Sequence, residues 1–490
     1  MDFAGILTAF FASVTPMSLG VVLLGTFLGI VVGALPGLGP TIGIALLIPI
    51  SYGMNTTNAL LLMAGIYTGG VYGGSITAIL LGIPGTTNST ATILDGFPMA
   101  QQGRSMDALG ASTMASAVGG FIAALCLMFF TPLVSRIVLY FGTAEQFMLA
   151  IFGLSVIAVA SRDTLLKGIL GGCFGLALAM VGYDPITGLD RFTFGSIQLA
   201  DGISFMVVIM GLFGISQTIS LAEESRSVSK TQKLSGSTLN GARITLKNWK
   251  ILLKASAMGA FFGAVPGVEG GAANMIAYTS IANGEPDKDT FGTGNIKGVI
   301  APEAANNATV GTALIPTLAF GIPGSTVCAV VMGLLTMQGI DVGPKLFAAP
   351  PTSLYVFFWG MLFTNFALVI IALPLLRYFA KVTILPYQIL VPNIIVLSVL
   401  GTYSLRYSFW DVFIAGVFGI VGYFLRRANF PMVTIVLGLV LGSLAESNLS
   451  RSLMINKGWS FLYKKPICLV LLIITCLIII LPYVKKDNRT

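Results

Sequence analysis

The sequence predicts an all-α polytopic membrane protein with about 10 to 14 transmembrane helices in two related halves, with Pro-Gly-broken (discontinuous or re-entrant) helices at a central site. Of the 490 residues, 55% are hydrophobic and 9% are charged, whereas about a quarter of the residues in a soluble domain are charged. The mean hydropathy of +0.91 holds over the whole length, so one anchor on a soluble domain cannot account for it. Pro-Gly pairs also recur at corresponding positions of the two halves.

Composition restricts the function as well. The chain has no histidine, which excludes His-ligated metals, His-dependent catalytic pairs and His proton relays. The 5 cysteines lie singly in apolar segments, a pattern typical of packing residues rather than of metal ligands. The net charge of +8 comes from basic residues spread between apolar segments, which favours a positive-inside bias of the loops over nucleic-acid binding. We therefore expect no metal, no cofactor and no nucleic-acid partner.

The polar segment 223–250 is the longest interruption of the apolar pattern. It is too polar to form a core, so we expect a basic cytoplasmic linker there. The linker divides the chain into a first transmembrane half, 1–222, and a second half, 251–490. Within the second half, the apolar run 466–484 lies between two lysine pairs and predicts an extra C-terminal span.

An internal repeat relates the two halves. Segment 29–37 reads GIVVGALPG and segment 259–267 reads GAFFGAVPG, so every Gly, Pro and central Ala recurs. Segment 82–86 (GIPGT) and segment 321–325 (GIPGS) match next, in the same order and at nearly the same spacing. Two ordered matches predict that the halves share one structural plan.

The repeated Pro-Gly pairs interrupt apolar segments. Proline removes a helical hydrogen bond, and each freed backbone group costs several kcal/mol in hydrocarbon unless a partner satisfies it. A short surface loop or a packing kink could explain any single pair. Four pairs in matching places are instead typical of the discontinuous helices that form the binding sites of secondary transporters.

Each break is followed by residues that suit the start of a helix. A helix N-terminus carries roughly half a positive charge and free N–H groups, so it can bind a carboxylate without a cationic side chain. The scarcity of Lys and Arg inside the spans favours such binding over an arginine clamp, although the polar residues could act as N-caps alone. The predicted substrate-binding residues are Pro36, Gly37, Gly39, Thr41, Pro84, Gly85, Thr86, Thr87, Asn88, Ser89, Pro266, Gly267, Pro323, Gly324, Ser325 and Thr326.

A second polar group lies in the apolar segment 301–308, which reads APEAANNA. Acidic and amide side chains inside a membrane are costly unless they have partners. Their oxygens suit Na⁺, and a glutamate could equally carry a proton. The predicted cation-binding residues are Asn274, Glu303, Asn306 and Asn307.

Three strings carry a resemblance to a known family: PGLGPTIGIALLIP, AGIYTGGVYGGSITAILLGIPGTTNSTATILDGFPMA and KGVIAPEAANNATVGTALIPTLAFGIPGS. With their flanking spans they cover both halves, and the chain resembles the large permease subunit of bacterial tripartite tricarboxylate transporters. The resemblance implies a multi-pass protein of the bacterial inner (cytoplasmic) membrane. It also implies import of small di- or tricarboxylates such as citrate, driven by a gradient of Na⁺ or H⁺. Its implied partners are a small transmembrane subunit and a periplasmic solute-binding protein.

Other possibilities stay open at this point. The second half has Glu269 where the first has Gly39, so the two halves could bind different ligands. A one-component carrier or channel for organic anions is the main alternative. A membrane-embedded enzyme is disfavoured because the H-E-x-x-H pattern is absent and Tyr183-Asp184 has no partner motif. The sequence does not choose the carboxylate, the coupling ion, the repeat orientation or the type of motion, and it leaves a homo-oligomer open.

Overall fold

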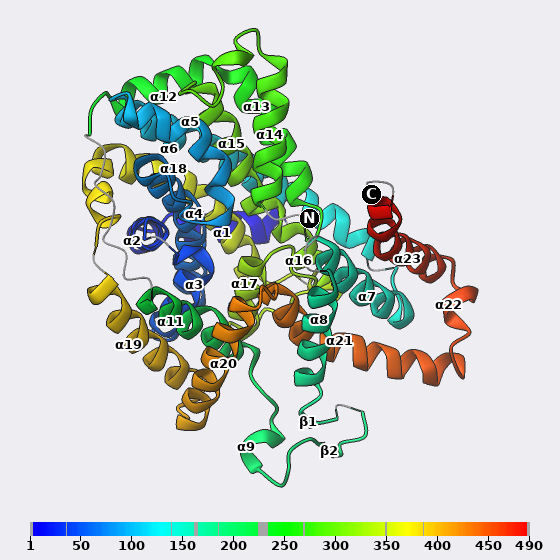
Figure 1. Cartoon of the computed structure of the whole chain (residues 1–490). Helices are drawn as coiled ribbons and strands as arrows, with labels where there is room; N and C mark the ends of the chain where they lie inside the picture. The colour runs from blue at the N-terminus through cyan, green and yellow to red at the C-terminus, as the bar shows by residue number, and fades with distance from the viewer. Residues whose placement is uncertain are drawn as a thin grey trace.

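The computed structural model describes residues 3–35, 37–138, 140–160, 165–184, 186–223, 234–267, 270–347, 350–385 and 387–487. These residues are mostly helical (Figure 1), and the strands among them are one short antiparallel pair, β1 (Gly182–Tyr183) with β2 (Asp190–Arg191). Eight of the described helices are long and apolar enough to cross a membrane. The prediction of an all-α polytopic membrane protein is confirmed.

The first half begins with helices whose ends follow from local sequence. Thr15 caps α2 by accepting a hydrogen bond from the Ser18 N–H, and Pro16 occupies the first turn, where its missing N–H costs nothing. Asn55 caps α4 in the same way, through the Asn58 N–H. The elements are α1 (Phe3–Ser13), α2 (Pro16–Gly33), α3 (Gly39–Tyr52), α4 (Thr56–Leu81), η1 (Thr87–Ser89), α5 (Thr90–Gln101) and α6 (Ser105–Val138).

The middle of the chain, from α7 to α12, contains shorter and less regular helices than the first part. A π-helical segment, η3, lies between two α-helical pieces and packs against α20. The predicted linker falls partly outside the described residues, and its part 238–247 forms the helix α12, which packs on α6. The elements are α7 (Thr143–Ala160), α8 (Leu165–Ala179), α9 (Ile197–Ala200), α10 (Phe205–Ile209), η3 (Met210–Ile215), α11 (Ser216–Glu223) and α12 (Thr238–Lys247).

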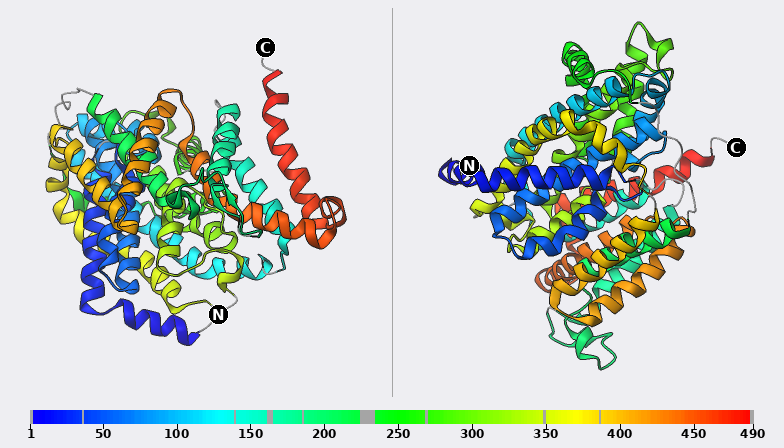
Figure 2. Two further views of the ribbon diagram at one scale, coloured as in Figure 1. Left: turned by 90° about the horizontal axis from the view of Figure 1, so that it is seen from below. Right: turned by 90° about the vertical axis from the view of Figure 1, so that its left-hand side faces the viewer.

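The second half repeats the order of the first and then extends it. The elements that correspond in order to α2, α3, α4, α5 and α6 are α13 (Trp249–Gly263), α14 (Gly270–Gly284), α15 (Lys297–Thr312) with α16 (Leu314–Phe320), α17 (Thr326–Met337) and α18 (Thr352–Val382). Two short turns without a counterpart lie between them, η4 (Lys288–Thr290) and η5 (Pro344–Phe347). The added elements are α19 (Tyr387–Arg406), α20 (Phe409–Arg427), α21 (Met432–Asn456), α22 (Phe461–Lys464) and α23 (Pro466–Asp487). Helix α23 includes residues 466–484; it lies at the edge of the molecule (Figure 2) and packs on α7.

The repeated glycines have the same backbone conformation in both halves. Gly82 ends α4 at φ 68° and Gly321 ends α16 at φ 72°, each in the left-handed region that favours glycine. Gly37 and Gly267 match as well, at φ 83° and φ 80°. The sequence repeat is therefore also a repeat of local structure.

Contacts between the halves are reciprocal. Helix α6 packs on α15, and α18, the counterpart of α6, packs on α4, the counterpart of α15. Likewise α14 packs on η1 and α5, while its counterpart α3 packs on α17. Such an exchange of equivalent partners is the mark of an interface with two-fold character. It brings the break of each half against a helix of the other half.

The dense glycines of segment 65–75 serve close packing of α4 against α2. A Cβ added at Gly65 would lie 2.6 Å from the Thr26 nitrogen, and one added at Gly25 would lie 2.5 Å from the Leu62 carbonyl oxygen. Small residues allow this approach of two helix backbones inside a membrane. Helix α4 is almost wholly buried, and the break at Gly82–Gly85 follows directly at its C-terminal end.

Candidate functional site

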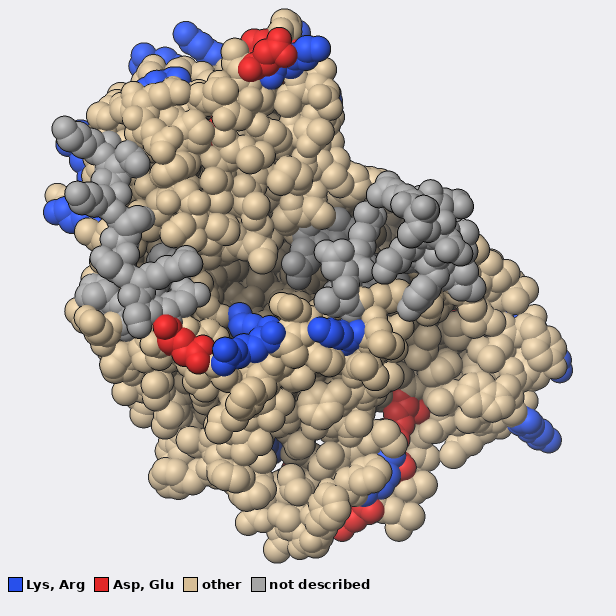
Figure 3. Space-filling model, viewed as in Figure 1, with Lys and Arg blue, Asp and Glu red and all other residues tan. Residues whose placement is uncertain are grey.

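The chain breaks of both halves meet at two adjoining cavities. The first cavity has a volume of about 400 Å³ and is lined by Gly37 and Gly85 of the first half together with Ser325 of the second. The second cavity has a volume of about 1090 Å³ and adds Gly267 and Gly324. Figure 3 shows a hollow between the region of α13 and α14 and the region of α11 and α20. Segments far apart in sequence thus line one common site.

Most of the residues predicted from sequence to bind substrate line these cavities. Ser89, Pro266 and Pro323 are not among the lining residues, and Pro36 lies outside the described residues. The lining residues are Gly37, Gly39, Thr41, Pro84, Gly85, Thr86, Thr87, Asn88, Gly267, Gly324, Ser325 and Thr326. Their role in binding stays a prediction.

At the second break, Ser89 holds the new helix start in place. Its hydroxyl donates to the Thr86 carbonyl oxygen at 2.9 Å and accepts from the Thr86 N–H at 3.3 Å. Thr87, between them, is exposed and lines both cavities. Ser89 is therefore a capping residue, and Thr87 and Asn88 present polar groups to the cavity.

The fourth break is built in a similar way. Ser325 caps α17 by accepting a hydrogen bond from the Cys328 N–H at 3.2 Å. The Gly324 N–H donates to the Thr317 hydroxyl at 3.2 Å. The third break touches the fourth directly, because the Gly267 N–H donates to the Gly324 carbonyl oxygen at 3.2 Å. Ser325 thus combines a capping role with a place in the cavity wall.

The helix starts supply the cavity with partial positive charge. Helix α3 begins at Gly39 without a side-chain cap, so its first N–H groups are available to a ligand. Helices α5, α14 and α17 also start at the breaks, while Glu269, before α14, lies outside the described residues. Among the described lining residues none is acidic. This electrostatic environment suits an anion.

Among the described residues, one cationic side chain lines the cavities, and it is not one of those predicted from sequence to bind substrate. Arg426, in the last turn of α20, lines both of them, as does Gln217 of α11. The sequence favours helix ends over an arginine clamp; the structure adds Arg426 to the lining residues, and a role of either in binding stays a prediction. In the sequence, Arg426-Arg427 ends an apolar span, where such a pair is typical of the membrane surface.

The four residues predicted to bind a cation lie deeper than the cavities. All are fully buried, and none is among the lining residues. In α15, Glu303 precedes the cavity-lining Thr309 by about 9 Å of helix rise. Asn306 and Asn307 occupy the turn between them, and Asn274 of α14 donates to the Asn88 carbonyl oxygen. A polar column therefore connects Glu303 with the break region.

Glu303 has hydroxyl partners on three other helices. It accepts hydrogen bonds from Ser75 of α4 at 2.6 Å, from Thr92 of α5, and from Ser112 and Ser116 of α6 at 3.1 and 2.9 Å. No ion pair to Glu303 is found in the described part of the chain. A buried carboxylate with hydrogen bonds but no cationic partner is costly, and a bound cation or proton would remove that cost.

The asparagines of this column keep oxygen atoms without hydrogen-bond partners. The unpaired atoms include the Oδ1 atoms of Asn274, Asn306 and Asn307. Outside the column, Asn365 of α18 also has an unpaired Oδ1, which lies against Gly120 of α6. Unpaired buried amide oxygens are rare in proteins, and they are ligands that a hard cation accepts. Sequence reasoning did not find Asn365, which lies outside the repeated strings.

Asp95 fastens the loop between α14 and α15 to α5. Its Oδ1 accepts the N–H groups of Gly292, Gly294 and Asn295 at 2.8 to 2.9 Å, and its Oδ2 accepts the Tyr278 hydroxyl at 2.9 Å. Asp95 is fully buried. It therefore holds together two elements, α5 and α14, that both start at the breaks.

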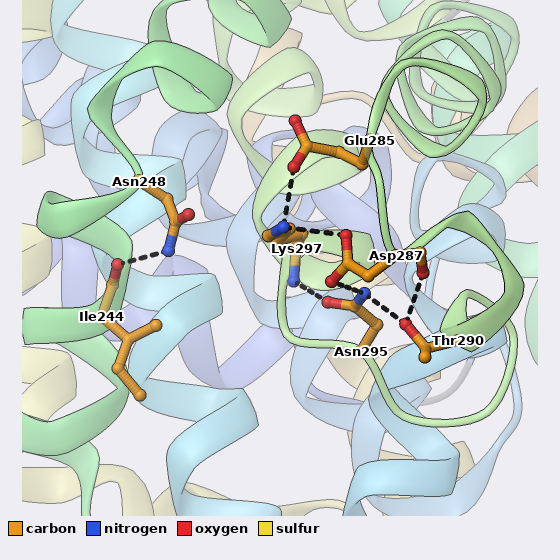
Figure 4. Close-up of polar contacts among 7 residues, drawn as sticks. All are labelled: Ile244, Asn248, Glu285, Asp287, Thr290, Asn295 and Lys297. Atoms are coloured by element: carbon orange, nitrogen blue, oxygen red, sulfur yellow. Dashed lines mark hydrogen bonds and ion pairs between the residues drawn. The ribbon is translucent and has the colours of Figure 1, made fainter.

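The same loop carries a surface ion-pair cluster (Figure 4). The Lys297 ammonium lies 2.7 Å from Glu285 and 2.9 Å from Asp287. The hydrogen bond from Lys297 holds the pKa of Asp287 below its ordinary value. Asn295 also donates a hydrogen bond to Asp287 at 3.1 Å. The loop is therefore held by polar contacts among its own residues in addition to its hydrogen bonds to Asp95.

The protein is a mostly helical, multi-pass membrane protein in which broken helices from two related halves meet at two adjoining cavities. Residues 19–437 match the tripartite tricarboxylate transporter TctA family. The chain belongs to this family, and it is therefore a large subunit of a tripartite transporter, a class that works with further subunits and a binding protein.

Two relatives come from Agrobacterium vitis. One, described as an uncharacterized 52.8 kDa protein in the TAR-I ttuC' 3'region, is 35% identical over 491 residues, which cover 98% of this chain and 96% of the relative. The other, an uncharacterized protein in the TAR-II ttuC' 3'region, is 34% identical over 238 residues, which cover 47% of this chain and 97% of the relative. No solved structure matches the chain.

Proposed function

We propose that this chain is the permease of a secondary active transporter that imports small di- or tricarboxylates of the citrate type. The solute is delivered by a periplasmic binding protein, a small transmembrane subunit completes the transporter, and the complex lies in the bacterial inner membrane. The observation that carries the proposal is the meeting of Gly37, Gly85, Gly267 and Gly324 at two adjoining cavities without acidic lining residues among those described.

Electrostatic magnitudes support a carboxylate at this place. An uncompensated charge at the centre of a bilayer costs about 3 kcal/mol or more. A helix N-terminus stabilises an anion by about 0.3 to 1 kcal/mol, and by up to about 2 kcal/mol when partly buried. The four helix starts at the breaks therefore offset roughly one or two charges. A di- or tricarboxylate needs further positive charge, which a coupled cation supplies.

The polar column of α15 is the proposed place of that cation. The cation ligands would be the carboxylate of Glu303 and the amide oxygens of Asn274, Asn306 and Asn307. Among the described residues, the Glu303 carboxylate has only hydroxyl partners, and the three amide oxygens have no hydrogen-bond partner. Either Na⁺ or a proton on Glu303 would neutralise the carboxylate. Because Asn274 also binds the Asn88 carbonyl oxygen, cation binding there would act directly on the second break.

The test is uptake by the complete transporter in proteoliposomes. The radiolabelled solutes are citrate, tartrate, succinate and benzoate, each measured with an inward Na⁺ gradient, with an inward proton gradient and with neither. We expect accumulation of at least one di- or tricarboxylate that requires the gradient and the binding protein. If none accumulates under any gradient, the proposal is wrong.

Omitting one component at a time separates the alternative. Gradient-driven flux through this chain alone, undiminished without the other two components, would identify a one-component carrier. Flux that never exceeds equilibration and does not saturate with solute concentration would identify a channel.

A further inference from the structure

We propose that Arg426 binds a carboxylate group of the transported solute directly and is a specificity-determining residue of this site. The inference rests on the proposed function and adds a residue outside the repeated Pro-Gly segments. It assigns to α20, which follows the repeated part of the second half, a direct part in recognition.

The first support is the position of the side chain. Arg426 lines both cavities, as do Thr87 of the second break and Ser325 of the fourth. Among the described residues of either cavity wall, it is the only Lys or Arg. Figure 3 shows basic residues along the lower edge of the hollow. The full positive charge and the helix starts therefore face the same space.

The second support is the lack of an anionic partner. Arg426 is half-buried, its Nε is buried without a hydrogen-bond partner, and its Nη2 donates to the Ser216 hydroxyl at the long distance of 3.5 Å. No ion pair of Arg426 occurs within the ranges that the structure describes. A partly buried guanidinium without a counter-charge is unfavourable, so this site favours an anionic ligand.

The adjacent arginine gives a direct comparison. The Arg427 side chain is 67% exposed, lies 3.8 Å from the Glu223 carboxylate and donates to the Tyr423 hydroxyl at 2.8 Å. One member of the pair is thus neutralised at the surface, and the other faces the cavity without a described counter-charge. Membrane-surface anchoring explains Arg427 but does not explain the position of Arg426.

The third support is the way in which the fold positions this side chain. The π-helical segment η3 comes directly before Ser216 and Gln217 and packs closely on α20, since a Cβ added at Gly422 would lie 3.1 Å from the Leu212 Cα. Gln217 lines both cavities, and its Nε2 would lie 2.8 Å from a Cβ at Gly37. Single π-helical turns are frequent at functional sites. Here the π-helical segment leads directly into the residues that lie beside Arg426 and the first break.

The chemistry of the guanidinium fits a carboxylate. It keeps its charge at every physiological pH, and its planar fork can donate two parallel hydrogen bonds to one carboxylate group. A solute with two or more carboxylates can place one on Arg426 and another on the N–H groups of the breaks. The two kinds of donor together account for selection of a multiply charged solute.

The experiment compares Arg426→Gln, Arg426→Lys and the matched control Arg427→Gln in the complete transporter. The probe is whichever of citrate, tartrate, succinate and benzoate the unmodified transporter takes up fastest, measured as initial rate against solute concentration at saturating binding protein. We expect Arg426→Gln to reduce the uptake rate at low solute concentration by about tenfold or more. Arg426→Lys keeps the charge but loses the planar fork, so its uptake rate should lie between that of Arg426→Gln and that of the unmodified transporter. The uptake rate of Arg427→Gln should stay within about twofold of that of the unmodified transporter.

Equal amounts of folded protein are verified by size-exclusion chromatography and by co-purification of the small subunit. If the unmodified transporter takes up the probe and Arg426→Gln behaves like Arg427→Gln, the inference is wrong while the proposed function stands. If the unmodified transporter takes up none of citrate, tartrate and succinate, the proposed function fails first.

Discussion

Ser75 of α4 donates a hydrogen bond of 2.6 Å to the carboxylate of Glu303 in α15, and both side chains are fully shielded from solvent. Helix α4 belongs to the first half of the repeat and α15 to the second, and they occupy equivalent positions in their halves. The contact therefore joins the two halves at their centre. Glu303 is therefore an ionisable group placed so that a change of its charge would affect the break after α4 in the first half and the break after α16 in the second half.

Glu303→Gln tests the role of this group in coupling. The substitution keeps the size of the side chain but removes the negative charge that would hold a cation. The amide oxygen still accepts from two hydroxyl groups, whereas the amide nitrogen can only donate, so the other two hydroxyl groups must turn to accept from it. We expect gradient-driven accumulation to fall by about tenfold or more, whereas exchange of solute across the membrane at equal cation concentrations is retained. Uptake assays with and without the gradient measure both quantities. Glu285→Gln, in the surface loop, is the control, and accumulation in Glu303→Gln equal to that control would contradict the role.

The pair Thr87 and Ser89 separates binding from capping within the single turn η1. Thr87 faces both cavities, and Ser89 is buried and hydrogen-bonded to the backbone of Thr86. Thr87→Ala should lower uptake severalfold with little change in stability. Ser89→Ala should lower stability by about 1 kcal/mol, the usual effect of losing a cap. Uptake kinetics and thermal unfolding in detergent distinguish the two; the reverse pattern would remove Thr87 from the site.

The matched glycines Gly82 and Gly321 should differ in their tolerance of alanine. Both have left-handed backbone, which costs a non-glycine residue about 1 to 2 kcal/mol. A Cβ at Gly82 would lie 3.0 Å from the Phe97 ring, whereas the nearest atom to a Cβ at Gly321 is 3.5 Å away. Gly82→Ala should therefore be the more destabilising by about 1 kcal/mol or more. The melting temperatures of the two variants provide the measurement, and a larger loss for Gly321→Ala would contradict the packing described.

Removal of the Asp95 carboxylate should free the loop between α14 and α15. Asp95→Ala leaves three backbone N–H groups without their acceptor, at a cost of about 3 kcal/mol or more. Hydrogen exchange of residues 291–296 should become faster by tenfold or more, about the effect of 1.4 kcal/mol. Asp289→Asn, an exposed aspartate of the same loop, is the control. Unchanged exchange in Asp95→Ala would show that the loop is held by other contacts.

The sequence was sufficient to predict the features that local chemistry determines. Helical membrane spans follow from long apolar segments, and the matching φ angles of Gly82 and Gly321 follow from a repeat visible in the Pro-Gly strings. The presence of most of the predicted residues in one cavity wall follows from the same repeat, because equivalent breaks in two related halves meet at their interface.

The remaining features depend on contacts between residues far apart in the chain. Ser112 and Ser116 reach Glu303 only because α6 packs on α15. Arg426 and Arg427 are neighbours in sequence, and the packing of α20 on α11 gives them different environments, with Ser216 beside one and Glu223 beside the other. Nothing in the sequence around Asp95 indicates that its carboxylate binds the loop between α14 and α15 of the other half. No local pattern in a single sequence specifies these partners.

The central claim is that a carboxylate binds where the chain breaks of the two halves meet. The most direct measurement is an experimental structure of the complete transporter, determined with the carboxylate that it accumulates and again without it. The account predicts density for the carboxylate within contact of Thr87, Ser325 and Arg426, absent from the solute-free structure. Density for the same solute at another place, with the cavities at the breaks unchanged between the two structures, would contradict it.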